Sequence, residues 1–300
     1  DTLASTAVDT QAEIAALAAI VKSIFATAAG ESVVPPLTPQ DLAALGISGV
    51  DTDNIAAVIA AIAGTADNGS GIDSLSELSA VVDATLAASR AAFTVISGYD
   101  GTNTIPSEAE FSAIAVTGVN PANISSVNSV LAVLSSSATD LRAEVQAVVD
   151  TYVAILNGAD GVANAGLSLT AAQYQNIGLT EITTSSQANL LNSIIDSSAT
   201  SGVDTYAELQ VLGNIVARLA AVAAGGAASP PLAPAELALI GIDGVTTSNL
   251  AAVLAAIAAT ADNGSGIDTL VKLQSVVATG IANARAASQA VISNYNGTNT

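Results

Sequence analysis

Apolar residues recur along this chain at the spacing of α-helices. One face of a helix is outlined by three- and four-residue steps in two segments that lie 195 residues apart: Ile55, Val58, Ile59 and Ile62, and Leu250, Val253, Leu254 and Ile257. No stretch alternates apolar and polar residues with the period of a strand, and aromatic residues make up only 3% of the chain, which is low for the core of a sheet. The pattern predicts an all-α fold.

The helical pattern is repeated in tandem. Variants of the motif Asp-Ser/Thr-x-x-Glu-apolar end at Ile14, Leu78, Val145, Leu209 and Leu273, with spacings of 64, 67, 64 and 64 residues. The nine residues Thr-Ala-Asp-Asn-Gly-Ser-Gly-Ile-Asp at 65–73 return letter for letter at 260–268. Such self-similarity at a fixed period is typical of repeat proteins. We therefore predict a tandem array of repeats of about 64 residues.

Each repeat is predicted to hold three helices. The boundaries are 1–35 for the C-terminal part of a preceding repeat, 36–104 for repeat 1, 105–166 for repeat 2, 167–230 for repeat 3 and 231–300 for repeat 4. Since a unit of this kind buries its apolar face against its neighbours, the array is expected to form a rod or a superhelical solenoid.

Capping residues predict where the helices begin. Capping boxes open the short first helix at Thr38, Ser107 and Thr170, and the long third helix at Thr10, Ser74 and Thr205. The middle helix is predicted to start at Asp51, Asn120, Thr183 and Thr246. The first helix is predicted to stop at Gly46, Gly178 and Gly241, where a left-handed residue is favoured, whereas repeat 2 has Ala115 there.

Charge excludes two classes of partner. The chain carries 26 acidic and 6 basic residues, a net charge of −20, and such a surface repels nucleic acid and anionic membranes. The most apolar stretches, 55–66 and 250–261, are too short to cross a bilayer, so no membrane span is expected. All six basic residues fall on the predicted third helices, where they are interpreted as solvated surface paired with nearby acids.

The side chains required by most enzymes are missing. The chain has no His and no Cys, so the usual general bases, thiolates and transition-metal ligands are absent from the sequence. Its many Ser and Thr residues have no adjacent base, and their places at helix starts are explained by capping. The sequence therefore predicts a protein that is not an enzyme.

One repeated loop has the composition of a calcium site. Alternating oxygen-bearing side chains and glycines can surround a calcium ion, which takes 6–8 oxygen ligands. The candidate ligands are Asp67, Asn68, Ser70 and Asp73, with their copies Asp262, Asn263, Ser265 and Asp268. The alternative is a helix–helix loop in which glycine turns the chain and Asp73 caps the next helix. The terminal glutamate and full spacing of an EF-hand are lacking.

Three segments of repeat 1 carry a resemblance to a known group. Residues 37–50 (Leu-Thr-Pro-Gln-Asp-Leu-Ala-Ala-Leu-Gly-Ile-Ser-Gly-Val), 54–58 (Asn-Ile-Ala-Ala-Val) and 72–78 (Ile-Asp-Ser-Leu-Ser-Glu-Leu) resemble the Ala-rich helical tandem repeats of very large secreted bacterial surface proteins. These are adhesin-like and biofilm-associated proteins. The resemblance extends over the chain, repeat by repeat, and implies an extracellular or cell-surface location and a non-enzymatic role in a stalk, fibre or adhesin.

Two interpretations of the function follow. The first is a repeat segment of a giant extracellular structural protein, whose partners are further repeats of the same chain and which self-associates into a fibre. The second is a binding module that presents its repeated loops to glycans or to other cells, or a subunit of a self-assembling filament or sheath. Many further 64-residue repeats in the neighbouring sequence would favour the first interpretation, and a flanking lectin-like domain would favour the second.

Overall fold

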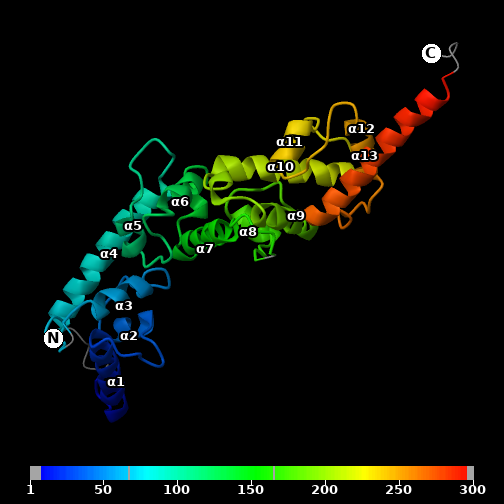
Figure 1. Cartoon of the computed structure of the whole chain (residues 1–300). Coiled ribbons are helices and arrows are strands. Elements are labelled where there is room, and N and C mark those ends of the chain that lie inside the picture. Colours follow the sequence, from blue (N-terminus) through cyan, green and yellow to red (C-terminus); the bar gives the residue numbers. More distant parts are fainter. Residues whose placement is uncertain (1–7, 67, 165, 296–300) are drawn as a thin grey trace. The chain divides into compact units, whose positions relative to one another are not determined.

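The fold is built from helices. The computed structural model describes residues 8–66, 68–164 and 166–295, and within these ranges it contains 13 α-helices and no strand (Figure 1). Asp160 and Ala199 form an isolated antiparallel bridge. The prediction of an all-α fold is confirmed.

After the first helix, the described helices follow a repeating order of short, medium and long. The first helix is α1 (Gln11–Ala28). The helices that follow are α2 (Pro39–Ala44), α3 (Ile55–Ala63) and α4 (Leu75–Ser97); α5 (Glu108–Ala113), α6 (Ile124–Leu131) and α7 (Arg142–Gly158); α8 (Ala171–Asn176), α9 (Ser185–Asp196) and α10 (Tyr206–Ala223); and α11 (Pro234–Leu239), α12 (Leu250–Ala258) and α13 (Leu270–Ser293). Two 3-10 turns, η2 (Ser136–Ala138) and η3 (Thr200–Gly202), lie in the Ser-rich joints before α7 and α10.

The chain divides into two compact units. The first unit comprises residues 1–124 and 131–146, and the second comprises residues 125–130 and 147–300. The division passes through α6 and α7, so each unit holds part of both helices.

The first unit is organised around α3 and α4. Helix α3 packs against α1 and α4, and α5 packs against α4. One apolar cluster joins Ile24 of α1 to Leu42, Val58, Ile62 and Val82, each of which is at most 2% exposed. The core of this unit therefore includes the helix that precedes α2 along the chain.

In the second unit, α9 packs against α8, α10 and α13, and α12 packs against α10 and α13. Its core contains fully buried side chains of α8, α9 and α10, among them Tyr174, Leu191, Ile215 and Leu219. In both units the long helix of one triplet therefore packs against a helix of the next triplet, α1 against α3 and α10 against α12.

Most of the predicted helix starts are observed. Reciprocal capping boxes open α1, α2, α4, α5, α8 and α10 at the residues named from the sequence, Thr10, Thr38, Ser74, Ser107, Thr170 and Thr205. A capping box joins the N-cap residue to the residue three positions further along the chain. Because this interaction is local, it can be recognised from the sequence alone.

The predicted starts of the middle helices are wrong. Helix α3 begins at Ile55 rather than at Asp51, because Asp51 and Asn54 first close a separate turn. In that turn Asn54 donates its side-chain amide to the carbonyl oxygen of Gly49 at 3.1 Å. Asn123 and Asn249 make the same bond to Gly118 and Gly244, so α6 and α12 also begin later than Asn120 and Thr246. Helix α9 begins at Ser185, with Thr184 rather than Thr183 as its N-cap.

Ala115 adopts the conformation of the glycines it replaces. Gly46, Gly178 and Gly241 have φ values of +84°, +91° and +78°, and Ala115 has φ +52°. The left-handed conformation crowds a Cβ atom and costs roughly 1–2 kcal/mol in residues other than glycine. The carbonyl oxygen of Ala115 accepts hydrogen bonds from Nε and Nη2 of Arg142, at 3.2 and 2.8 Å, and these bonds hold the turn in place.

We predict that Ala115→Gly raises the free energy of unfolding by about 0.5–1 kcal/mol, because relief of the Cβ strain exceeds the added backbone entropy of glycine. Ala113→Gly is the matched control, since Ala113 lies within α5 and the same exchange there should cost about 1 kcal/mol. Urea denaturation of both variants measures the effects. Destabilisation of the chain by Ala115→Gly would contradict the strain assigned to this residue.

Gly280 permits a close approach of α12 and α13. A Cβ atom at Gly280 would lie 2.6 Å from the Cα of Val253 and 2.9 Å from the carbonyl oxygen of Ala252. Both atoms belong to the α12 backbone, which can move only if the two helices separate. We predict that Gly280→Ala lowers the free energy of unfolding by about 1–3 kcal/mol, although alanine is the better helix former.

Gly213→Ala provides the control for this prediction. Gly213 also lies inside a long helix, α10, but an added Cβ would collide only with the end of the flexible Glu181 side chain and would make an ordinary contact of 3.6 Å with Leu179. The exchange should therefore be neutral or stabilising in the same denaturation experiment. Equal effects at Gly280 and Gly213 would contradict the close helix approach.

Candidate functional site

The repeated loop contains a turn that is built in the same way in both copies. Asn68 accepts a hydrogen bond from the backbone N–H of Ser70 at 3.1 Å, and Asn263 accepts one from Ser265 at 3.0 Å. The apolar residue of the loop is buried in both copies, with Ile72 4% and Ile267 2% exposed. Asp67 lies outside the described residues. The amide oxygens proposed as metal ligands therefore serve the turn itself.

The two copies differ in the charge beside the last aspartate. In the second copy, Lys272 donates to the Oδ1 of Asp268 at 2.6 Å and to the carbonyl oxygen of Ser265 at 3.1 Å. The ammonium group thus contacts one predicted ligand, the Asp268 carboxylate, and the backbone carbonyl oxygen of a second candidate residue, Ser265. A calcium ion would compete with this cation for Asp268, and calcium at the second copy stays a prediction.

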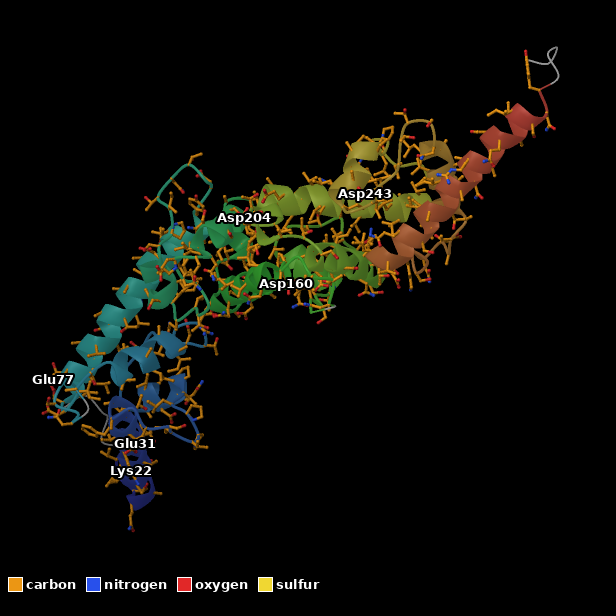
Figure 2. The ribbon with its side chains drawn as sticks, in the orientation of Figure 1. Lys22, Glu31, Glu77, Asp160, Asp204 and Asp243 are labelled. Carbon is orange, nitrogen blue, oxygen red and sulfur yellow. The ribbon has the colours of Figure 1, made fainter. Side chains whose placement is uncertain are left out.

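The first copy has a carboxylate where the second has the lysine. Glu77 follows Asp73 by one helical turn, and Figure 2 shows Glu77 at the start of α4. A hydrogen bond to Glu77 and repulsion from its charge raise the pKa of Asp73, whereas the same contact and the Ser74 hydroxyl lower the pKa of Glu77. Both carboxyl groups are fully exposed, and the same pairing raises the pKa of Asp204 beside Glu208. A pair of neighbouring carboxyl groups therefore occurs at the starts of both α4 and α10.

Among the described residues, no group of three or more acidic side chains comes together as a metal cage. Within the ranges that the structure describes, the exposed oxygens of the 68–73 loop have no ion pair with a basic side chain, and Glu77 is a potential ligand that was not expected from the sequence. Its carboxylate already accepts hydrogen bonds from the N–H and hydroxyl of Ser74 at 3.1 and 2.9 Å. Calcium at the first loop remains a prediction.

We predict that any rise in melting temperature on adding calcium comes from the first loop. Asp67→Ala should abolish the rise, and Asp262→Ala should leave it unchanged, because Lys272 already pairs with Asp268 in the second loop. Thermal melts with calcium and with magnesium measure the response. If calcium does not change the melting temperature of the unmodified chain, both loops are turns before a capped helix and bind no calcium.

The glycines of the loop have a packing role. Gly69 and Gly264 adopt φ values of +74° and +77°. A Cβ atom at Gly69 would collide with the Phe25 ring of α1, and one at Gly264 would lie 3.3 Å from the Cβ of Ser186 in α9. Phe25 precedes Gly69 by 44 residues and Ser186 precedes Gly264 by 78, so each loop is approached by an earlier helix, which supplies a structural reason for glycine at this position.

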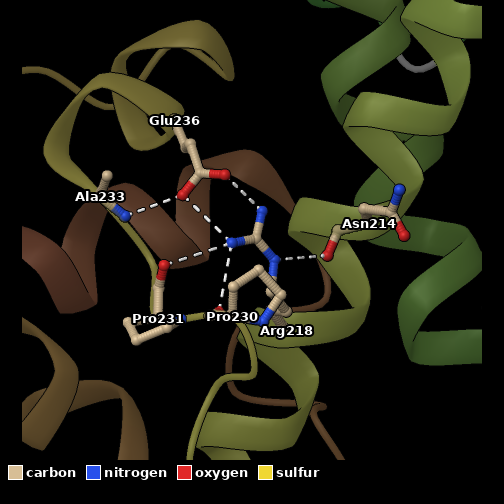
Figure 3. Close-up of polar contacts among 6 residues, drawn as sticks. All are labelled: Asn214, Arg218, Pro230, Pro231, Ala233 and Glu236. Carbon is tan, nitrogen blue, oxygen red and sulfur yellow. Dashed lines mark hydrogen bonds and ion pairs between the residues drawn. The ribbon is translucent and has the colours of Figure 1, made fainter.

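Arg218 forms the most extensive polar cluster around a basic residue in the described part of the chain (Figure 3). Its guanidinium binds both oxygens of Glu236, with Nη2 to Oε1 at 2.6 Å and Nη1 to Oε2 at 3.1 Å, and Nε donates to the Asn214 carbonyl oxygen at 3.2 Å. Nη1 also approaches the carbonyl oxygens of Pro230 and Pro231, at 3.4 and 3.5 Å. The Arg218 side chain is only 11% exposed.

Glu236 connects this cluster to the start of α11. Its Oε2 accepts the N–H of Ala233 at 2.8 Å, which compensates in part for an N-cap without a side-chain oxygen. The hydrogen bond from Arg218 lowers the pKa of Glu236. A surface depression of about 560 Å³ lies beside the pair and is lined by residues of α10 and of the 227–230 segment. The Arg218–Glu236 pair thus holds α10 to the start of α11 beside this depression.

The interpretation of the basic residues as solvated surface is therefore correct only in part. All six do lie on the long helices: Lys22, Arg90, Arg142, Arg218, Lys272 and Arg285. Arg142 and Arg218 are partly buried and hold backbone carbonyl groups of other segments. Lys272 is exposed and pairs with Asp268.

Two buried polar residues of α9 were missed by sequence reasoning. Asn192, 5% exposed, accepts the N–H of Leu169 and donates to its carbonyl oxygen, and it also accepts the Tyr174 hydroxyl at 2.7 Å. Asp196, 3% exposed, accepts the N–H groups of Asn164 and Gly166 at 2.8 and 3.1 Å. Both side chains fix the irregular segment that leads into α8.

Only one of these residues gives a signal in the sequence. Asp196 lies in the last turn of a helix, where the dipole disfavours an acid, and this misplacement points to another partner. Asn192 is one polar residue among many. Burial raises the pKa of the Tyr174 hydroxyl, which is consistent with its role as a neutral donor to Asn192.

Two of the described helices, α1 and α4, are long and apolar enough by length and composition alone to cross a membrane. Core helices of folded proteins and signal sequences satisfy the same criteria. Only 28% of the apolar window in α4 is buried, although its inner face packs on α3 and α5. The expectation that the chain has no membrane span stays a prediction.

The comparisons do not place the chain in a known family. No protein-family model, no curated protein and no solved structure matches it.

Proposed function

We propose that this chain is a repeat segment of an extracellular structural protein, in which stacked three-helix repeats form a rod or superhelical solenoid. The protein would act as a surface stalk, fibre or adhesin, and its partners would be further repeats and further copies in a fibre. The chain's extreme acidity keeps such a surface hydrated and soluble.

One repeated hydrogen bond carries the proposal. The N–H of Tyr206, the first residue of α10, donates to the Ser129 hydroxyl of α6 at 2.9 Å. The N–H of Leu270, the first residue of α13, donates to the Ser193 hydroxyl of α9 at 3.0 Å. Both bonds span 77 residues. The two donors lie 64 residues apart in the sequence, and so do the two acceptors. The same bond therefore recurs at equivalent positions of successive repeats, as translation along an array requires.

Three more links across predicted repeat boundaries support the same geometry. The Ser89 hydroxyl of α4 donates to the carbonyl oxygen of Ala113 in α5 at 2.7 Å. The Tyr152 hydroxyl of α7 donates to the carbonyl oxygen of Val203, just before α10, at 2.9 Å. The Arg218–Glu236 pair connects α10 to α11. A continuous structure is favoured by these links, because independent domains joined by linkers would not need them.

The alternative binding function has weaker support. The repeated loops do expose Asn68, Ser70, Asp262 and Asn263 to solvent, as a surface for glycans would require. The side-chain oxygens of Asn68 and Asn263 already accept hydrogen bonds within local turns. The loop glycines allow close packing against α1 and α9. We therefore retain the structural array as the proposed function.

The proposal is tested on cells that make the protein. Antibodies raised against the 300-residue chain should label intact cells, and electron microscopy should show the label along stalks or fibres. Brief protease treatment of intact cells should release the label, while a cytosolic marker stays protected. Labelling only after permeabilisation would reject the extracellular location, and label confined to dispersed monomers would reject the fibre.

A further inference from the structure

Two equivalent long helices, α4 and α13, differ in how their C-terminal halves are covered. They start from matching anchor residues, Leu78 at 4% and Leu273 at 0% exposure. Val82 and Val277, four residues further on, are also buried in both helices. The two helices therefore pack alike within their own triplets.

Their second halves diverge. Ser89, Ala92 and Ile96 of α4 are 3%, 3% and 1% exposed. At the same distances from the anchor, α13 has Ala284, which is partly exposed, Ala287, which is exposed, and Val291, which is 72% exposed. The next residue, Ile292, is 75% exposed. Helix α13 thus presents an uncovered apolar face, defined by Ala284, Ala287, Val291 and Ile292.

The covered helix shows what fits this face. Helix α5, which belongs to the next triplet along the chain, packs against α4, and Ser89 donates its hydroxyl to the Ala113 carbonyl oxygen at the end of α5. Phe111 and Ile114, both 1% exposed, are buried in the same segment. Helix α5, with its buried aromatic residue Phe111, and the C-cap residue Ile114 that follows it therefore form the segment that packs on α4 near Ser89.

We infer that the uncovered face of α13 is a docking surface for one further three-helix repeat whose first helix resembles α5. The occupant follows α13 in the same polypeptide, as α5 follows α4. The two connections share the residues Gly-Thr-Asn-Thr, at 101–104 and 297–300, and the second of these stretches lies outside the described residues. This inference rests on the proposed array, but it does not depend on an extracellular location.

The inference is tested by lengthening the full chain. A second copy of residues 105–230 is joined directly after Thr300, and hydrogen exchange of the unique segment 284–295 is followed by mass spectrometry. Its amides should exchange on the order of 100-fold more slowly in the lengthened chain than in the 300-residue chain. The segment 89–97 of α4 serves as the covered reference within each molecule.

A matched pair of substitutions separates docking from a general gain in stability. Val291→Asp should leave the parent chain unchanged, because Val291 is exposed there, and should remove the protection gained in the lengthened chain. Gln289→Asp is the control. It lies at the position equivalent to the exposed Thr94 of α4 and should change neither chain.

Two results would overturn the inference. The first is a lengthened chain in which 284–295 exchanges as fast as in the parent, whether or not the added repeats fold. The second is a parent chain that already protects 284–295 and forms a dimer by light scattering, because a second copy would then cover the face. Cell-surface labelling is independent of both results, so failure here is distinguishable from failure of the proposed function.

Discussion

Residues 36–104, produced alone, are expected to lose their helical signal at a temperature far below that of the 300-residue chain. This segment is one predicted repeat and loses its cover on two sides. Ile24 and Ala28 of α1, 2% and 0% exposed, belong to the same apolar cluster as Leu42 and Ile62. At the other end, α5 no longer covers the second half of α4. A piece of about 70 residues with small apolar side chains is marginally stable even when complete.

Thermal melts followed by circular dichroism measure this expectation. A longer piece, 1–104, restores α1 and should melt between the single repeat and the whole chain, because each added helix covers an exposed apolar face. The dependence on length should vanish if the repeats are independent domains. Equal melting temperatures for 36–104 and the 300-residue chain would thus contradict the continuous array.

Asn192→Ala is expected to lower the free energy of unfolding by about 3–5 kcal/mol. The substitution removes the partner of three buried groups: the N–H of Leu169, its carbonyl oxygen and the Tyr174 hydroxyl. Leu169 and Tyr174 are 7% and 0% exposed, so water cannot readily replace the lost bonds. Each unsatisfied buried group costs about 1–3 kcal/mol, which makes this cost larger than the loss of packing.

Two control variants isolate the hydrogen bonds. Asn189→Ala makes the same exchange on the exposed side of α9 and should be neutral or slightly stabilising, because alanine is the better helix former. Tyr174→Phe removes only one of the three bonds and should cost about 1 kcal/mol. Urea denaturation measures all three variants. An Asn192→Ala cost no larger than that of Tyr174→Phe would show that the two Leu169 bonds contribute little.

Local interactions explain why much of the helical organisation is predictable from the sequence. A capping box joins residues three positions apart, as Thr38 and Asp41 do, and a left-handed stop such as Gly46 needs one residue with a permissive backbone. The same logic failed for the middle helices. Asp51 is a good N-cap by composition, but Asn54 bonds back to the Gly49 carbonyl oxygen and closes an extra turn first. The sequence is compatible both with a helix that starts at Asp51 and with a turn closed by Asn54, and it does not show which of the two forms.

The candidate calcium site illustrates a different limit. Composition made the two loops equivalent, since their nine residues are identical. Their environments differ because position 77 is Glu and position 272 is Lys, one helical turn beyond each loop. Only the tertiary structure shows that Lys272 contacts both Ser265 and Asp268. A charge outside a motif can thus alter the motif's chemistry.

The sequence by itself determined the all-α class, the helix caps at Thr10, Ser74 and Thr205 and the 64-residue spacing of the motif, because each depends on residues close together in the chain. The tertiary structure alone decided which helices share a core and which polar groups are buried. Asn192 meets Leu169 across 23 residues, and Ser193 meets Leu270 across 77. Such pairs are set by the path of the folded backbone, and a polar residue carries no local mark of the distant group that it will bind.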